Sequence, residues 1–82
     1  MLFHIKQTHA PADCPYGKGG SRSLFEYQSK EVKVVGYWLA FPQHTIYLVV
    51  ETDDIGKLQT FLKPGAATTI CEVTPVSSEP AP

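Results

Sequence analysis

The chain has 82 residues, enough for one domain but too few for two separate hydrophobic cores. Its formal net charge is −1, and its seven basic residues are scattered, which disfavours nucleic-acid binding. No segment reaches the roughly 20 apolar residues of a membrane span, and the first ten residues lack the apolar block of a signal peptide. We therefore expect a cytoplasmic protein with no membrane partner. In that compartment Cys14 and Cys71 are expected to be thiols or metal ligands.

The first expected strand covers residues 1–9, with Phe3 and Ile5 on one face and His4 on the other. Residues 10–20 follow with two prolines, three glycines and no periodic pattern. So long an irregular connection is uncommon in a small domain, and it is typical of a functional or disordered segment.

A β-hairpin is predicted over residues 32–52, because β-branched and aromatic residues dominate there and turn chemistry is confined to residues 41–44. Pairing across this turn places Trp38 opposite Tyr47 and Val35 opposite Val50. The expected core face carries Val35, Tyr37, Leu39, Ile46, Leu48 and Val50, and the other carries Gly36, Trp38, Ala40, Thr45, Tyr47 and Val49. Both faces are apolar, so both are expected to be covered.

Two helices and a last strand complete the pattern. Ser23 and Glu26 have the spacing of a capping box, which predicts a short helix over residues 24–30. Asp53 is the expected N-cap of an amphipathic helix that ends at residues 63–65. Its buried stripe is Ile55, Leu58, Phe61 and Leu62. Residues 68–76 form the last expected strand.

The resulting order is β-α-β-β-α-β, an α+β fold of the ferredoxin-like type with a four-stranded antiparallel sheet. Right-handed crossovers place strands one and three in the centre and both helices on one face. A second copy of the chain is the simplest cover for the bare face, which predicts a homodimer or higher oligomer. We expect the domain to span residues 1–76 and residues 77–82 to be a disordered tail.

At this point the chain shows a resemblance. It is similar to the dimeric α/β-barrel superfamily of ferredoxin-like proteins, and more narrowly to a short bacterial group of uncharacterised function. The residues that carry this likeness are His9-x4-Cys14-Pro15 and Pro42-x-His44-Thr45-x-Tyr47. The resemblance implies two sheets packed face to face. The superfamily includes cofactor-free monooxygenases, isomerases, haem proteins and small-ligand regulators, but none of their catalytic motifs matches here, so no functional residue is carried over.

The strongest functional indication comes from topology. Strand one ends at His9 and strand three begins at His44, so antiparallel pairing brings both to one edge of the sheet. Cys14 lies on the loop that leaves this edge. Two imidazoles and one thiolate form a ligand set for Zn²⁺, Cu or Ni with one open position. The same trio also has the composition of a thiol nucleophile with a histidine base. In the structural alternative, the histidines bond nearby backbone and Cys14 is an ordinary loop thiol.

Other residues carry weaker indications. His4 has the opposite parity from His9 and is expected on the other face. Trp38, Tyr47 and Thr45 share the bare face and suggest a small-molecule pocket, for which a dimer interface is the alternative. A Cys14–Cys71 bridge stays open, since it needs neighbouring Cα atoms.

Three functional hypotheses follow. The leading one is a homodimeric metal-binding protein that uses His9, Cys14 and His44. The second is an enzyme that acts on a small organic molecule with a Cys/His pair, and the third is a non-catalytic ligand-sensing or interaction module.

Overall fold

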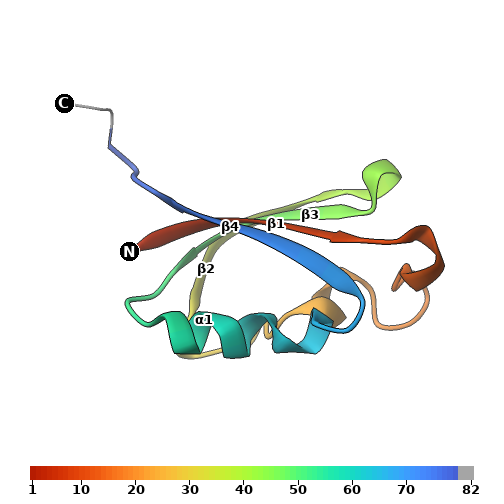
Figure 1. The fold of residues 1–82 in the computed structure, drawn as a ribbon, viewed down its shortest axis with the longest axis horizontal. Helices are drawn as coiled ribbons and strands as arrows, with labels where there is room; N and C mark the ends of the chain where they lie inside the picture. The colour runs from red at the N-terminus through yellow and green to blue at the C-terminus, as the bar shows by residue number, and fades with distance from the viewer. Residues whose placement is uncertain (80–82) are drawn as a thin grey trace.

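The computed structural model of the chain describes residues 1–79. Its strands form one antiparallel sheet in the order β2-β3-β1-β4, with β1 and β3 in the centre as predicted. The elements are β1 (Leu2–His9), β2 (Lys33–Ala40), β3 (Thr45–Glu51), α1 (Ile55–Leu62) and β4 (Thr69–Val76). The α+β architecture is ferredoxin-like, with α1 and the first crossover on the same side of the sheet (Figure 1).

The core lies between the sheet and α1. Each fully buried Leu, Ile, Val or Phe side chain contributes roughly 1.5–3 kcal/mol to folding. The core side chains are Phe3, Ile5, Leu24, Phe25, Val32, Ile46, Leu48, Val50, Leu58 and Phe61. Along β1 the alternation that buries Phe3 and Ile5 also buries Gln7 and His9. This strand therefore carries two polar side chains on its core face, and His9 is the one at the sheet edge.

The predicted helix over residues 24–30 is wrong. The crossover contains a 3₁₀ turn at Ser21–Leu24, and irregular turns follow it. The Ser23 hydroxyl donates a 2.6 Å hydrogen bond to the Gly20 carbonyl instead of capping a helix. Phe25 has an extended backbone, with φ −158° and ψ 165°, and its side chain is buried in the core. Burial of this ring overrides the local capping signal, so α1 is the single α-helix of the described residues.

The hairpin register is confirmed near the turn and wrong farther from it. Trp38 pairs with Tyr47 as predicted, but a β-bulge between Val34 and Gly36 shifts the pairing beyond it, so Val34 rather than Val35 lies opposite Val50. Val34 packs against the core, whereas Val35 is 55% exposed. One extra residue in a strand reverses the side-chain alternation beyond it.

Helix α1 is confirmed, with Leu58 and Phe61 buried, but Ile55 of the predicted buried stripe is exposed. The cap is one residue later than predicted. The Asp54 carboxylate accepts hydrogen bonds from the backbone N–H groups of Gly56 at 2.7 Å and Lys57 at 3.2 Å. Asp53 instead pairs with the N-terminal amine at 2.9 Å, which lowers the pKa of its carboxyl.

The face of the sheet opposite α1, which we call the open face, carries Trp38, Tyr47, Lys6 and Glu72 side by side across the four strands. Trp38 is 59% exposed there. No helix of the described residues is long and apolar enough to cross a membrane. Strand β4 ends at Val76, and the disordered tail predicted from residue 77 onward stays a prediction, with residues 80–82 outside the described part.

Candidate metal centre

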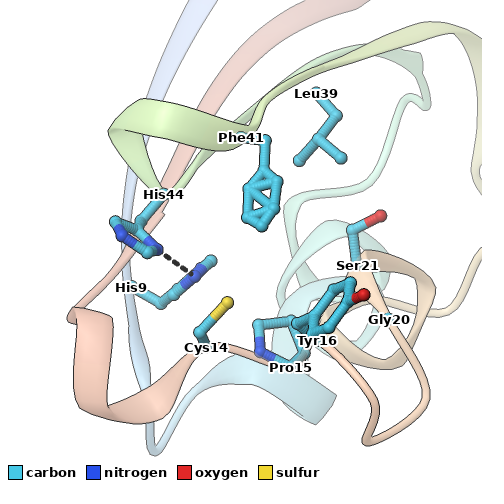
Figure 2. Close-up of a pocket in the computed structure, with 9 residues that line it drawn as sticks. All are labelled: His9, Cys14, Pro15, Tyr16, Gly20, Ser21, Leu39, Phe41 and His44. Carbon is cyan, nitrogen blue, oxygen red and sulfur yellow. Dashed lines mark hydrogen bonds between the residues drawn. The ribbon is translucent and has the colours of Figure 1, made fainter.

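Two strand ends bring the histidines together. His9 is the last residue of β1 and His44 directly precedes β3, and the two strands are antiparallel neighbours. The His9 backbone N–H donates a 3.0 Å hydrogen bond to the His44 carbonyl. The side chains also meet, with His44 Nδ1 3.2 Å from His9 Nε2 (Figure 2). The convergence predicted from topology is confirmed.

Cys14 reaches the same place through a tight turn. Pro11–Asp13 form a 3₁₀ turn, and the Cys14 backbone N–H closes it with a 3.2 Å hydrogen bond to the Pro11 carbonyl. This turn reverses the chain leaving β1, and the Cys14 sulfur faces the histidine pair (Figure 2). The three ligand atoms of His9, Cys14 and His44 all lie within 4.8 Å of one another.

These distances can be compared with those around a tetrahedral ion. Zn–N distances of 2.0–2.1 Å place two ligating nitrogens about 3.3 Å apart, and a Zn–S distance of 2.3 Å places nitrogen and sulfur about 3.6 Å apart. The nitrogens of His9 and His44 are already near this separation at 3.2 Å. The Cys14 sulfur is within 4.8 Å of both, which exceeds the N–S separation around zinc by no more than about 1.2 Å. The three side chains are therefore close enough to hold a metal ion.

The backbone at His44 is unusual. Its φ of 52° and ψ of 42° place it in the left-handed region, which no other non-glycine residue of the described part adopts. For an L-residue this conformation costs roughly 1–2 kcal/mol. The turn that imposes it is closed by a 3.0 Å hydrogen bond from the His44 N–H to the Phe41 carbonyl. Such strain clusters at functional sites, which marks His44 as a functional candidate on backbone grounds alone.

The surroundings of His9 lower the pKa of its imidazole. Burial lowers the pKa of the His9 imidazole, the neighbouring His44 lowers it further, and the charge of Asp13 opposes both effects. A metal ligand must offer an unprotonated nitrogen, so a lowered pKa favours coordination near pH 7.

The second nitrogen of His9 limits its tautomer. His9 Nδ1 is buried and has no hydrogen-bond partner among the described residues. A proton on Nδ1 would leave a buried donor unsatisfied, at a cost of about 1–3 kcal/mol. The metal-free protein therefore favours the proton on Nε2, donated to His44 Nδ1. Coordination through Nε2 would require this proton to move to Nδ1 or to leave the ring.

A cavity of about 100 Å³ adjoins the three side chains. The side of the cavity away from these three residues was not predicted from the sequence. Residues of the irregular loop, the hairpin turn and β2 form it. The rings of Tyr16 and Phe41 lie 5.9 Å apart between their centroids. The lining residues are His9, Cys14, Pro15, Tyr16, Gly20, Ser21, Leu39, Phe41 and His44 (Figure 2). The length of the irregular loop is the one sequence signal that pointed here.

The remaining candidate residues lie elsewhere. Trp38 and Tyr47 are on the open face, and ligand binding by them stays a prediction. Thr45 is buried, and its hydroxyl donates a 2.9 Å hydrogen bond to the Gln43 carbonyl. His4 faces away from His9, with its ring centroid 6.0 Å from that of Tyr47.

Cys14 and Cys71 are both free, so the Cys14–Cys71 bridge is not formed. Cys71 is partly buried against the core, and its sulfur lies 3.7 Å from the Thr69 hydroxyl.

Fold and site together define a small ferredoxin-like α+β protein with a histidine–cysteine cluster at one edge of its sheet. Residues 1–79 match the family described as Domain of unknown function (DUF3303), and the chain belongs to this family. A search of curated proteins and a search of solved structures each find no match to the chain.

Proposed function

We propose that the protein binds one transition metal ion through His9, Cys14 and His44 and leaves one coordination position open. The observation that carries the proposal is the convergence of three ligand atoms within 4.8 Å, from a strand end, a loop and a hairpin turn. Mixed nitrogen and sulfur ligands suit Zn²⁺, Cu or Ni better than Mg²⁺ or Ca²⁺. Three protein ligands with a free position are typical of catalytic or transport sites rather than structural ones.

Metal analysis of the purified protein tests the proposal directly. We expect about one equivalent of metal after loading and dialysis, and a loss of this metal in a His9→Ala/Cys14→Ser double variant. A His4→Ala/Cys71→Ser double variant is the matched control, because it removes the same residue types from other places. Sub-stoichiometric metal in the parent protein, or equal metal in both variants, would contradict the proposal.

A second candidate function is thiol chemistry, favoured by the orientation of the Cys14 sulfur toward the histidine pair beside a cavity. In this case a histidine takes the proton of the thiol and the thiolate attacks a small organic substrate. Fast alkylation of Cys14 near neutral pH in protein that binds no metal would favour the enzyme. Slow alkylation at the rate of Cys71 would exclude it.

We also propose that the open face mediates homodimerisation in the cytoplasm. The exposed Trp38 and Ile70, at 59% and 75%, support this proposal. So do the opposite charges of Lys6 and Glu72, which occupy facing positions of β1 and β4. Trp38→Glu is expected to convert a dimer to monomer in size-exclusion chromatography. A dimer that survives this substitution would show that another surface is used.

A further inference from the structure

The three proposed ligands line one side of the cavity, which has a distinct chemical character. Beyond the three ligands its wall is formed by Pro15, Tyr16, Leu39 and Phe41 together with Gly20 and Ser21. None of the nine lining residues is Lys, Arg, Asp or Glu. The rings of Tyr16 and Phe41 and the side chain of Leu39 surround the space beyond the sulfur of Cys14 (Figure 2). The cavity thus joins a coordination position to an apolar chamber.

Charge narrows the choice of ligand. A divalent ion with one thiolate and two neutral imidazoles carries a net charge of +1. No acidic side chain of the lining is present to balance it. A monoanionic donor atom would make the centre neutral, which suits a lining that holds no charged side chain. A second charge on the ligand would find no charged side chain among the lining residues.

Size narrows the choice further. The cavity measures about 100 Å³. A closed apolar cavity of roughly 150 Å³ holds benzene, so the part of a ligand that lies inside this more open cavity is of that size or smaller. A short alkyl chain is smaller than benzene and meets this limit.

We propose, on the basis of the proposed metal function, that this site binds a small organic thiol. The thiol would coordinate the metal as its thiolate and lay a short uncharged body against Tyr16, Leu39 and Phe41. On binding, the thiol proton passes to solvent and the thiolate fills the open position, with no change in oxidation state. Thiolate is a preferred zinc ligand, and the apolar walls supply the selectivity for the body.

The experiment uses the full chain loaded with Co²⁺, whose near-ultraviolet charge-transfer absorption reports each new thiolate ligand. Loaded protein is titrated with 1-propanethiol and with 2-mercaptoethanesulfonate, which has the same donor atom on a charged body. We expect 1-propanethiol to bind at least about tenfold more tightly, a difference of about 1.4 kcal/mol. Equal affinities, no thiolate band with either probe, or tighter binding of imidazole than of 1-propanethiol would overturn the inference.

Two matched variants locate the effect. Leu39 lines the cavity and Val35 does not, and both lie on β2 with nearly equal exposure, 54% and 55%. Leu39→Ser is expected to weaken 1-propanethiol binding about fivefold while the Co²⁺ content stays at one equivalent, and Val35→Ser is expected to change neither. Equal effects of the two substitutions would overturn the assignment of the chamber. Failure to take up Co²⁺ would instead refute the metal site itself, so the two failures are distinguishable.

Discussion

Replacing His44 with glycine tests whether this residue serves as a metal ligand or is needed for folding. His44 holds a left-handed backbone that glycine adopts without strain, so His44→Gly removes the imidazole and relieves the turn at once. If the imidazole serves metal binding, the metal-free protein should tolerate its loss. If it serves folding, the variant should unfold easily.

In the metal-free protein, the gains and losses of unfolding free energy caused by His44→Gly nearly cancel. Relief of the left-handed conformation contributes roughly 1–2 kcal/mol. Against this, loss of the 3.2 Å contact with His9 costs about 0.5–1.5 kcal/mol. The extra freedom of glycine in the unfolded chain costs roughly 0.5–1 kcal/mol more. We therefore expect the free energy of unfolding of metal-free His44→Gly to lie within about 1 kcal/mol of the parent value.

Thermal unfolding with and without Zn²⁺ is the assay. At a free metal concentration of 100 Kd, binding stabilises the folded state by about 2.7 kcal/mol. For a domain of 60–100 residues each 1 kcal/mol raises the Tm by about 4–8 °C, so the parent Tm should rise by about 11–22 °C. In His44→Gly most of this rise in Tm should vanish. Loss of a residue that only supports a ligand lowers metal affinity roughly 10–100-fold, and loss of a ligand itself should lower the affinity more.

His4→Gln is the control for this experiment. His4 lies on the opposite face of β1, so its substitution should leave the zinc-dependent rise intact. If His44→Gly retains the full zinc-dependent rise in Tm, the His44 imidazole is not a ligand. If the metal-free variant loses more than about 3 kcal/mol of unfolding free energy, His44 serves folding, since no combination of the contributions above allows that loss.

Three further outcomes are expected. Gly65→Ala should lower the free energy of unfolding, measured in urea, by about 2–4 kcal/mol. The new Cβ would lie 2.5 Å from the Leu24 carbonyl oxygen and 2.8 Å from Gln7 Nε2, and it would break the 2.8 Å hydrogen bond between them. The metal-free protein should lose stability as the pH falls below about 6.5, because His9 has a lower pKa in the folded protein and takes up a proton more readily when unfolded. The slope of unfolding free energy against pH should be shallower in His9→Gln. Asp13→Asn should lower the pKa of the His9 imidazole further, because the charge of Asp13 raises this pKa in the parent protein. An unchanged His9 titration followed by NMR would contradict this expectation.

The meeting of the two histidines can be predicted from sequence because it depends on topology alone. Once β1 and β3 are antiparallel neighbours, the end of one strand and the start of the other must share an edge. The approach of Cys14 needs in addition the turn that Pro11 begins, and its short spacing from His9 makes that approach a reasonable prediction. None of these steps requires knowledge of side-chain packing.

The features that escape prediction all depend on competition between local and tertiary contacts. Ser23 satisfies a cap signal, yet burial of Phe25 draws the chain out of a helix. The bulge beside Val34 has no strong local signature, although Gly36 lies within it and a Cβ there would meet the Trp38 ring at 2.9 Å. The ring pair of Tyr16 and Phe41 joins two loops, which no periodic pattern can bring together.

The placement of His9 on the core face has a consequence for how metal binding and folding are linked. His9 shares the alternation of Phe3 and Ile5, and a slip of one residue in β1 would move all three to the open face. The packing of the core therefore holds the first ligand in place before any ion binds. An ion held by His9, Cys14 and His44 would tie the irregular loop to both central strands, so its binding energy would add directly to folding energy. Because the open face lies on the other side of the sheet, dimer formation there would leave the mouth of the cavity free for a ligand.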